Sequence, residues 1–337
     1  MTVRLAYGYQ NWTTAVHFER AFARLSTVAP FGPGHDAPDR GDGPLFWVES
    51  GISWVPDPAT LARAVSAAYL IDTHRGYGWR ARLAHAFDFA FTAQRPAAEQ
   101  LASDGMPAAW LPLAAPKDLC APGPRLADRP YDVAFVGQAP PGSFRAALVD
   151  AARQRFSVAP VAGRLEPAQM MDVYRSARVI LNDPIAGDLN MRVFEAPGAR
   201  ALQVTVAVPG IDLVPESAYA LVARRDVELW LRAIDDLLRD NDAQARADAA
   251  HTAIVNHHTY DNRAATVLER LASTPRRNFA RYERDESLAA AWARWHQPRQ
   301  IRALALPLPA AIRAQAESLG WSAATLGARL RRRLTAR

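Results

Sequence analysis

The first hundred residues alternate between apolar runs of strand length and segments whose apolar residues recur at helical spacing. "VRLAYGY" (3–9) is strand-like, and "TTAVHFERAFARL" (13–25) after it has the spacing of an amphipathic helix. The alternation continues through "DPATLARAVS", "AAYLIDTH", "YGWRARLAHAF", "DFAFTAQ" and "PAAEQLASDG". Strands that alternate with helices predict a parallel sheet with helices on both of its faces.

The same alternation begins again at residue 131, after a proline-rich stretch that has no periodicity. "YDVAFVGQ", "RVILND" and "ALQVTVAV" are its strand-like runs, separated by amphipathic segments. We therefore expect two α/β domains, 1–115 and 131–274, joined by a linker at 116–130. Residues 275–337 are expected to form a separate helical tail that bears tryptophans and many arginines.

Composition narrows the class of protein only slightly. The net charge is +6, and Lys117 is the only lysine among the 40 basic residues. This charge suits an anionic small molecule, a nucleic acid or an acidic membrane surface. Cys120 is the only cysteine, which excludes an internal disulfide and a thiolate metal cluster. No apolar stretch reaches the roughly 20 residues of a membrane helix, and the N-terminus lacks a signal pattern, so we expect a cytoplasmic protein.

The basic tail allows two interpretations. It could pack as an appended helical segment on one of the domains, or it could contact an anionic membrane surface or acidic partner from the cytoplasmic side. Apolar residues and arginines mix along "SAATLGARLRRRLTAR", so a clean membrane face is not evident. No known nucleic-acid-binding motif is present, and we expect no nucleic-acid partner.

The segment "LNMRVFEAPGARALQVT" (189–205) contains the first candidate site. Arg192 and Glu195 lie three residues apart near the predicted start of a short helix, which Asp188 or Asn190 could cap. A cation at a helix N-terminus is unfavourable unless an anion lies there too, and a carboxylate in such a loop can accept hydrogen bonds from ribose hydroxyls. The alternative is an Arg–Glu pair on a solvated helix face.

A second candidate is "VGQAPPGSFR" (136–145), where a strand ends at Gly137 and Arg145 lies in the next helix. Backbone N–H groups and Arg145 could bind a diphosphate there, although the pattern by itself favours a plain tight turn. It is not a Walker loop, because the Gly-Lys-Ser/Thr sequence is missing.

In the N-terminal domain, three residues follow predicted strands and are candidates for catalysis. His74 could make a polar contact to a ligand, and Asp72 could orient it. Asp72 and Glu49 are the carboxylates that could serve as a general base. An isolated histidine is more often structural, so both interpretations of His74 stay open.

The order of several segments resembles one known family. "YDVAFVGQAPPGSFR", "RVILND", "MRVFEAPGARALQVT" and "NHHTYDNRAATVLERL" resemble CgeB-like glycosyltransferases, a group related to the large retaining GT-B class. "LFWVESG", "YLIDTHRG", "AFDFAFTAQ" and "AAWLPLAA" match the N-terminal half of that group. The resemblance covers roughly residues 1–272 and implies the α/β GT-B fold, two Rossmann-like domains with parallel sheets facing across a cleft, plus the helical extension.

The resemblance also implies an activity. It implies a hexosyltransferase-like enzyme that moves a sugar from a nucleotide-sugar to an unidentified acceptor, with retention of configuration and without a metal or cofactor. Glu195 matches the glutamate that binds the donor ribose, and Arg192 matches the arginine of the group's R-x-F-E pattern, which meets the diphosphate. The wider class has a second glutamate eight residues before the first, and Gly187 occupies that position here. This departure puts the donor-sugar contacts in doubt, although Asp188 and Asn190 are close enough to substitute.

Two alternatives remain. A protein of this fold that binds nucleotide or sugar without catalysis would also fit, because Gly187 stands where the wider class has its second glutamate. The other is a surface-associated or nucleic-acid-associated protein that acts through its arginine-rich tail.

Overall fold

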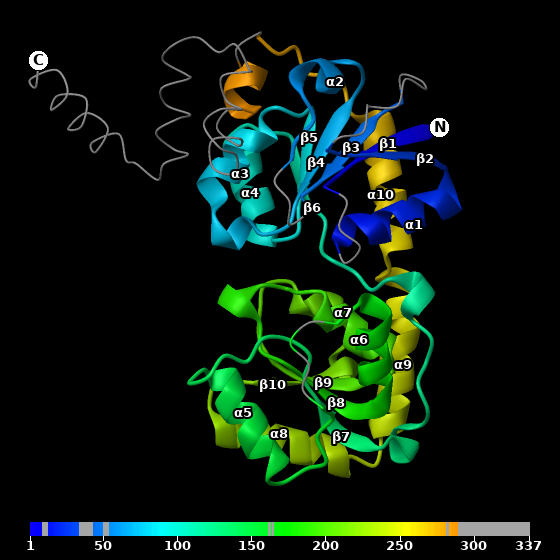
Figure 1. The fold of residues 1–337 in the computed structure, drawn as a ribbon, viewed down its shortest axis with the longest axis vertical. Helices are drawn as coiled ribbons and strands as arrows, with labels where there is room; N and C mark the ends of the chain where they lie inside the picture. Colours follow the sequence, from blue (N-terminus) through cyan, green and yellow to red (C-terminus); the bar gives the residue numbers. More distant parts are fainter. Residues whose placement is uncertain are drawn as a thin grey trace, which may run out of the picture. The chain divides into compact units, whose positions relative to one another are not determined.

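The computed structural model describes residues 1–8, 13–33, 43–49, 54–160, 163, 165–280 and 283–288 (Figure 1). The chain forms two compact units: unit 1 comprises Met1–Leu111 and Ala265–Arg337, and unit 2 comprises Pro112–Ala264. Unit 1 is therefore discontinuous in sequence. This division groups residues 116–130 with unit 2, and the domain boundaries expected from the sequence remain predictions.

Unit 1 is built on a parallel sheet in the strand order β2-β1-β3-β4-β5-β6. The strands are β1 (Thr2–Ala6), β2 (Thr27–Phe31), β3 (Leu45–Val48), β4 (Ser66–Leu70), β5 (Phe89–Thr92) and β6 (Ala108–Trp110). The helices are α1 (Thr14–Leu25), α2 (Pro58–Ala62), the 3-10 turn η1 (Thr73–Arg75), α3 (Tyr77–Ala84), α4 (Arg95–Ser103) and most of α10 (Tyr260–Ser273).

Side chains of unit 1 alternate between the two faces of its sheet, so each face has its own core. On one face Phe46 and Tyr69 pack against Phe18 of α1, with ring centroids 5.1 and 5.4 Å apart. On the other face Trp47 stacks on Phe87 at 5.7 Å, within a cluster that includes buried residues of α3 and α4. Strands buried on both faces explain the near-continuous apolar runs in the sequence.

Unit 2 has a second parallel sheet, in the order β10-β9-β8-β7. The strands are β7 (Tyr131–Ala134), β8 (Ala177–Asn182), β9 (Leu202–Val206) and β10 (Tyr219–Val222). The helices are α5 (Phe144–Arg153), α6 (Pro167–Ser176), α7 (Arg192–Gly198), α8 (Val227–Arg239), α9 (Ala243–His257) and the first residues of α10, with short 3-10 turns η2 (Lys117–Leu119), η3 (Leu126–Asp128), η4 (Ile185–Gly187), η5 (Ile211–Leu213) and η6 (Glu216–Ala218).

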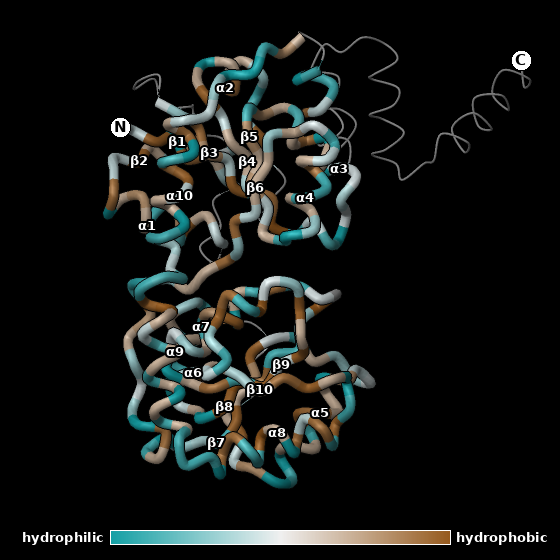
Figure 2. The backbone as a smooth tube through the Cα atoms, turned by 180° about the vertical axis from the view of Figure 1, so that it is seen from behind, coloured by the Kyte–Doolittle hydropathy of each residue, from teal (hydrophilic) through white to brown (hydrophobic). Residues whose placement is uncertain are grey.

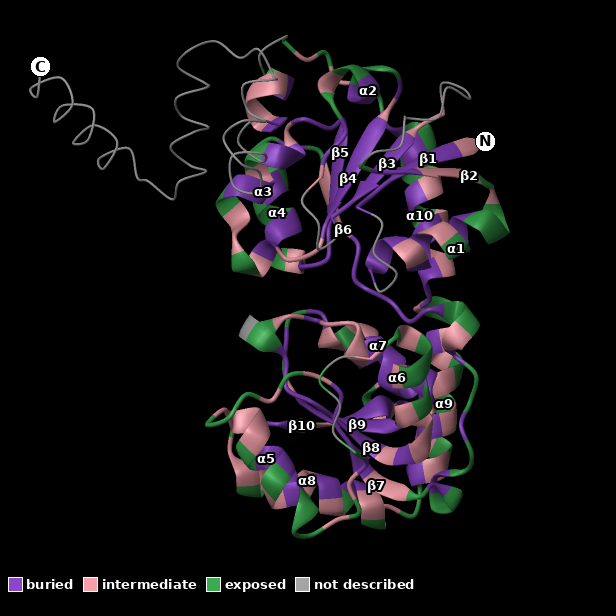
Figure 3. Cartoon of the chain, viewed as in Figure 1, coloured by how far each residue is buried: buried purple, intermediate pink, exposed green. Residues whose placement is uncertain are grey.

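The sheet of unit 2 is also covered on both faces. One core joins its strands to α5, α8 and α9 around Trp230, and the other joins them to α6 and α7 around Tyr174. The strands of both sheets are mostly buried and apolar, whereas the outer helices carry the exposed polar residues (Figures 2 and 3). The prediction of two α/β units with parallel sheets is therefore confirmed.

The strand order of unit 2 reverses at β7. Val133 of β7 pairs in parallel with Val158 on one side, and the chain then returns through α6 to β8 on the other side. A reversal of this kind is a topological switch point, and ligands of doubly wound sheets bind at the carboxyl ends of the strands that flank it. In unit 2 these ends belong to β7 and β8.

The proline-rich stretch 116–130 packs on unit 2 through Arg129, whose side chain is buried. Its guanidinium donates to the carbonyls of Ala177 at 2.6 Å, Arg200 at 2.8 Å and Ala199 at 3.1 Å. Burial, with the nearby charges of Arg200 and Arg175, lowers the pKa of Arg129 to about 10. The Arg129 side chain thus supplies hydrogen-bond donors to three backbone carbonyls at the ends of β8 and α7.

Of the predicted tail, residues 283–288 are helical, whereas 281–282 and 289–337 lie outside the described residues. Leu288 is buried in the core of unit 1. In the part of the chain that the structure describes, no helix is long and apolar enough to cross a membrane. Contact between the tail and a membrane surface stays a prediction.

Candidate functional site

Helix α7 begins at Arg192, with Met191 as its N-cap and no side-chain capping bond. The expectation that Asp188 or Asn190 caps this helix is therefore wrong. The Nδ2 of Asn190 instead donates to Oδ1 of Asn182 at 2.9 Å, at the carboxyl end of β8. The Oδ1 of Asn190 is buried and has no hydrogen-bond partner among the described residues, so this amide still has an acceptor to offer.

A proline inside α7 fixes the helix to the sheet. Pro197 has no N–H and leaves the carbonyl of Val193, four residues earlier, without its helical partner. Gln203 of β9 fills that place, because its Nε2 donates to the Val193 carbonyl at 3.1 Å. The short helix that carries Arg192 and Glu195 is thus held on the strand beside β8.

Arg192 connects the carboxyl ends of β7 and β8. Its guanidinium donates to Oδ1 of Asn182 at 3.2 Å, to the hydroxyl of Tyr174 at 3.1 Å and to the carbonyl of Val136. It also lies 5.5 Å from the ring centroid of Phe135. The sequence analysis placed Arg192 near the start of a short helix, and the structure places it at the switch point of the sheet.

Gly137 permits this arrangement. Its φ of 146° is one that residues with a Cβ rarely adopt, and an added Cβ would lie 3.1 Å from the Arg192 guanidinium. The glycine therefore lets Arg192 approach the backbone at the end of β7. The two halves of the candidate site, 136–145 and 189–205, meet here.

Arg145 belongs to a charged cluster that the sequence analysis did not single out. Asp183, directly after β8, accepts from Nε of Arg145 at 3.2 Å and from Nε of Arg225 at 2.7 Å. The Asp183 side chain is 5% exposed, that of Arg145 15% and that of Arg225 52%, so the cluster opens towards solvent at Arg225. Their position in the sequence was the available signal, because Asp183 and Arg225 each follow the end of a strand.

Glu195 is buried, with a residue exposure of 3%, and its carboxylate makes no hydrogen bond or ion pair with the residues that the structure describes. Burial raises its pKa to about 7, against the opposing effect of the Arg192 charge. The alternative interpretation, an Arg192–Glu195 pair on a solvated helix face, is therefore wrong. A buried carboxylate without a donor is costly unless a ligand supplies one.

The position of the missing class glutamate has a backbone explanation. Gly187 ends the 3-10 turn η4 with a φ of 73°, in the left-handed region that favours glycine. A glutamate at this position would be strained. Asp188 follows directly, half-buried, and its carbonyl accepts from the backbone N–H of Asn190 at 3.0 Å.

In unit 1, Glu49 follows β3 and forms a closed ion pair with Arg80 of α3. The Nε of Arg80 lies 2.8 and 2.9 Å from the two carboxylate oxygens of Glu49, which also accepts from the backbone N–H of Ile71 at 2.9 Å. The side chains are 10% and 5% exposed. These contacts give Glu49 a structural role, and its proposed role as a general base stays a prediction that the geometry does not favour.

Asp72 and His74 lie together in the turn that follows β4. Asp72 precedes η1, its carbonyl accepts from Arg75 N–H at 2.9 Å, and both Asp72 and His74 are partly accessible. Thr73 between them is buried and donates its hydroxyl to Gln94 at 2.6 Å, which fixes the turn. The structure thus groups these two residues beside Glu49 at the carboxyl ends of β3 and β4. Their roles in catalysis stay predictions.

Two further groups in unit 2 have shifted pKa values. Burial, and then the charge of Glu195, raise the pKa of the Cys120 thiol to about 12, which makes it unreactive. Burial, followed by the charges of Arg263 and His257, lowers the pKa of His258 to about 4. Among the described residues, no three His, Cys, Asp or Glu side chains are grouped as metal ligands would be. Independence from a metal stays an expectation.

Comparison with known proteins adds a family. Residues 127–269 match a family model described as glycosyl transferase-like. No curated protein matches the chain significantly. The match covers the whole candidate site of unit 2, from Gly137 to Glu195.

Solved structures with low sequence identity share the fold. A glycosyltransferase from Rickettsia africae superposes with a TM-score of 0.53 at 8% identity, over 81% of this chain and 98% of that one. HepE of Anabaena, in complex with UDP and glucose, gives 0.54 at 12% identity, over 81% of this chain and 100% of that one. For the pneumococcal O-GlcNAc transferase GtfA in complex with UDP and GlcNAc the TM-score is 0.49 at 11% identity, over 69% of this chain, which spans 57% of that one's length. The chain therefore has the fold of GT-B glycosyltransferase structures, and its residues 127–269 match a glycosyl transferase-like family.

Proposed function

We propose that the protein is a glycosyltransferase that moves a sugar from a nucleoside-diphosphate sugar to an acceptor, and that it is of the CgeB-like group. The glycosyl transferase-like match over 127–269 supports the reaction class. The fold similarity to HepE, which was crystallised with UDP and glucose, supports a nucleotide-sugar as the donor. The donor would bind at the carboxyl ends of β7 and β8.

The observation that carries the proposal is the unpartnered, buried carboxylate of Glu195. A ribose offers two neighbouring hydroxyl donors, which are the groups that such a carboxylate lacks. Hydrogen bonds to the charged form would also lower the raised pKa of Glu195. Binding of the nucleotide would thus relieve a cost that the free protein carries.

The diphosphate would lie against Arg192 and Arg145. A guanidinium has five N–H donors, and Arg192 uses three of them in the bonds described above. Arg145 also uses three, to the carboxylate and the carbonyl of Asp183 and to the carbonyl of Gln138 at 3.3 Å. Each residue therefore retains donors for phosphate oxygens. Charge that develops on the leaving diphosphate would be stabilised by these cations and by backbone N–H groups near Gly137. They supply the positive charge that a metal ion supplies in other transferases.

We further propose that the transfer proceeds with retention. The leaving phosphate would accept the acceptor's proton, so the reaction does not depend on Glu49, which Arg80 already occupies. His74 and Asp72 in unit 1 would contact the acceptor or the donor sugar. Asp188 and Asn190 would contact the donor sugar in place of the glutamate that Gly187 replaces.

The test is nucleotide binding by the intact protein. Thermal-shift titrations with UDP, GDP, ADP, CMP and dTDP should identify one base, and calorimetry should then give its dissociation constant. Glu195→Ala should raise that constant by about 10- to 100-fold, since a hydrogen bond to a charged group contributes about 1.5–3 kcal/mol. Loss of the 2′-hydroxyl in a deoxynucleotide should weaken binding to the wild type but not to the variant.

Glu228→Ala is the matched control, because Glu228 is an exposed glutamate of unit 2 whose partner is Arg155. It should leave the affinity unchanged. Equal nucleotide affinity in wild type and Glu195→Ala would remove Glu195 from the donor site.

A second candidate is a protein of this fold that binds the nucleotide-sugar without transferring it. Gly187 favours it, because a left-handed glycine stands where the wider class has a sugar-binding glutamate. Tight, Glu195-dependent nucleotide binding with no turnover of any donor would support this candidate. Release of nucleoside diphosphate from a donor sugar, by transfer or slow hydrolysis, would exclude it.

A further inference from the structure

The chain that follows α10 crosses the edge of unit 1 opposite to Glu49, Asp72 and His74. The backbone N–H of Arg277 donates to Oδ1 of Asp88 at 2.7 Å, and Asp88 directly precedes β5. The other oxygen of Asp88 accepts from the backbone N–H of Ser66, the first residue of β4, at 2.8 Å. Residues 276–280 are therefore anchored at the amino ends of β4 and β5.

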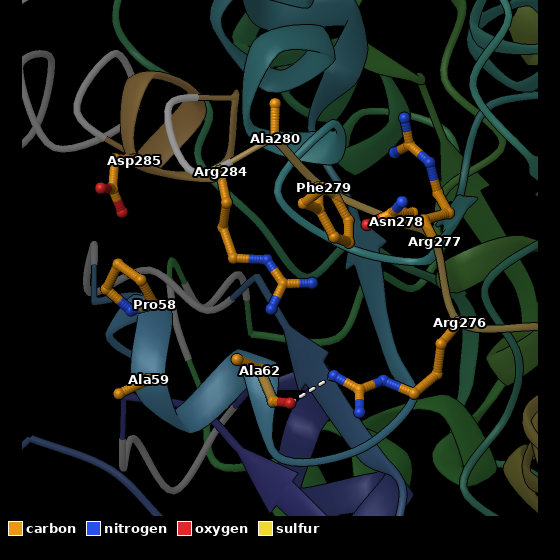
Figure 4. Close-up of a pocket in the computed structure, with 10 residues that line it drawn as sticks. All are labelled: Pro58, Ala59, Ala62, Arg276, Arg277, Asn278, Phe279, Ala280, Arg284 and Asp285. Atoms are coloured by element: carbon orange, nitrogen blue, oxygen red, sulfur yellow. Dashed lines mark hydrogen bonds between the residues drawn. The ribbon is translucent and has the colours of Figure 1, made fainter.

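A cavity lies between this segment and α2. Its volume is about 460 Å³. Pro58, Ala59 and Ala62 of α2 form an apolar wall, and Arg276, Phe279 and Arg284 line the facing side (Figure 4). This volume falls within the usual range for small-molecule sites, about 300–1,000 Å³, and is larger than a single ion requires.

Arg284 is buried in this cavity, and no carboxylate among the described residues forms an ion pair with it. The residue is 6% exposed, and its Nε is buried with no hydrogen-bond partner. The guanidinium lies 3.9 Å from the ring centroid of Phe279 and, within the described residues, makes no hydrogen bond or ion pair. Figure 4 shows it pointing between Phe279 and Ala62, into the cavity.

The neighbouring charges add to this imbalance. Arg276 donates to the carbonyl of Ala62, and Arg277 donates to the carbonyl of Phe87 at 3.1 Å, so both cations are held by neutral acceptors. Burial lowers the pKa of Arg284, the charges of Arg276 and Arg277 lower it further, and the charges of Asp88 and Asp285 oppose this shift. Asp285 also lines the cavity, but Figure 4 shows its carboxylate directed away from the Arg284 guanidinium.

We propose that this cavity is a binding site for a phosphate monoester with a small organic group. The phosphate would accept hydrogen bonds from Arg284 and Arg276, because a guanidinium fork matches phosphate oxygens and two negative charges offset more of the cluster than one carboxylate does. The organic group would lie against Phe279 and the apolar wall of α2. The site is on the amino edge of the unit 1 sheet and does not depend on the donor site proposed for unit 2.

Calorimetric titration of the full chain tests the site, at low ionic strength because salt screens exposed charges. Glucose 6-phosphate is the probe, with inorganic phosphate as its minimal form and glucose as the neutral control. We expect saturable binding of one glucose 6-phosphate, weaker binding of phosphate and none of glucose. Arg284→Met should weaken binding of glucose 6-phosphate at least tenfold.

Arg153→Met is the matched control, since Arg153 is a half-exposed arginine on α5 of unit 2 whose partner is Asp150. It makes the same change in net charge and should leave the affinity unchanged. Arg284→Met should fold, because it removes a buried unpaired charge. Should it fail to fold, Arg276→Met replaces it, because Arg276 is exposed and should also weaken binding.

Three results would overturn the proposal. The first is the absence of saturable binding at millimolar glucose 6-phosphate. The second is equal binding by Arg284→Met and Arg153→Met, which would assign the anion to the general basic surface. The third concerns the source of the phosphate: binding to vesicles that contain phosphatidic acid, without any binding of the soluble ester, would make the ligand a lipid headgroup.

Discussion

Each unit contains a buried glutamate near the carboxyl edge of its sheet, and the two have opposite surroundings. Glu49 in unit 1 is held by the Arg80 guanidinium and the backbone N–H of Ile71. Glu195 in unit 2 is still more buried, at 3% against 8% exposed, yet it makes no hydrogen bond or ion pair with the described residues. Sequence position does not distinguish them, since Glu49 directly follows β3 and Glu195 lies in the first α-helix after β8.

The difference matches the roles proposed for them, a structural carboxylate for Glu49 and a ligand-binding one for Glu195. A buried charge that is fully paired contributes to a stable arrangement and has no donor or acceptor left to offer. A buried charge without a partner lowers stability, and its persistence indicates a function that needs it. The variants below would break or sharpen this comparison.

Glu49→Ala should have the largest effect on stability. It leaves the Arg80 guanidinium buried without its counter-ion, a loss that costs about 3–5 kcal/mol. The free energy of unfolding, measured by urea titration, should fall by that amount, whereas the double variant Glu49→Met/Arg80→Met should recover much of it. If Glu49→Ala unfolds like the wild type, the pair is not structural and the contrast with Glu195 disappears.

Glu195→Gln should change stability in the opposite direction at high pH. Burial raises the pKa of Glu195 from its usual 4.5 to about 7, so between these values the folded protein holds a proton that the unfolded chain has released. The free energy of unfolding of the wild type must therefore fall as the pH rises through this window, by about 3 kcal/mol at most. In Glu195→Gln the free energy of unfolding should not fall in this way, because glutamine does not titrate.

Urea titrations at pH 5 and pH 8 measure this difference. The stability of Glu195→Gln relative to the wild type should be greater at pH 8 than at pH 5, and the constant cost of the amide cancels between the two conditions. Parallel changes in both proteins would show that Glu195 is not a destabilising buried acid.

Nucleotide affinity should depend on pH through the same group. If the ribose requires the charged carboxylate, protonation competes with binding below pH 7, and affinity should fall about tenfold between pH 8 and pH 6. The terminal phosphate of the nucleotide also titrates near pH 6. Glu195→Gln titrated in parallel corrects for it, and a wild type with the same profile as the variant would rule out the proton competition.

Arg192→Gln should produce the smallest change, a shift in the pH at which nucleotide affinity falls. The Arg192 charge opposes the effect of burial on Glu195, so its removal should raise the pKa of Glu195 and move the midpoint to higher pH. The midpoint is informative even if the variant also binds the diphosphate more weakly. An unchanged midpoint would mean that the two side chains are not electrostatically coupled.

The fold followed from the sequence because strands buried on both faces leave strong apolar runs, such as "RVILN" in β8. The donor-site candidates Gly137, Arg145, Arg192 and Glu195 were found because they lie just beyond such runs. Their partners were not found. Tyr174 lies inside α6, where nothing in the local pattern shows that its hydroxyl meets Arg192. Whether a buried glutamate is paired, as Glu49 is, or unpaired, as Glu195 is, depends on residues far apart in sequence.

The discontinuity of unit 1 bears on how the chain is made. Unit 2 is a continuous segment that can be completed soon after residue 264 has been synthesised, whereas unit 1 needs residues beyond 265. Until they emerge from the ribosome, Asp88 lacks its bond from Arg277, and the core lacks Leu288. Domains generally fold in N-to-C order during synthesis. In this chain, residues 1–111 can complete their unit only after residues from 265 onwards have been synthesised. A truncation after residue 264 should therefore damage unit 1, which loses its C-terminal residues, more than unit 2, which keeps its whole segment.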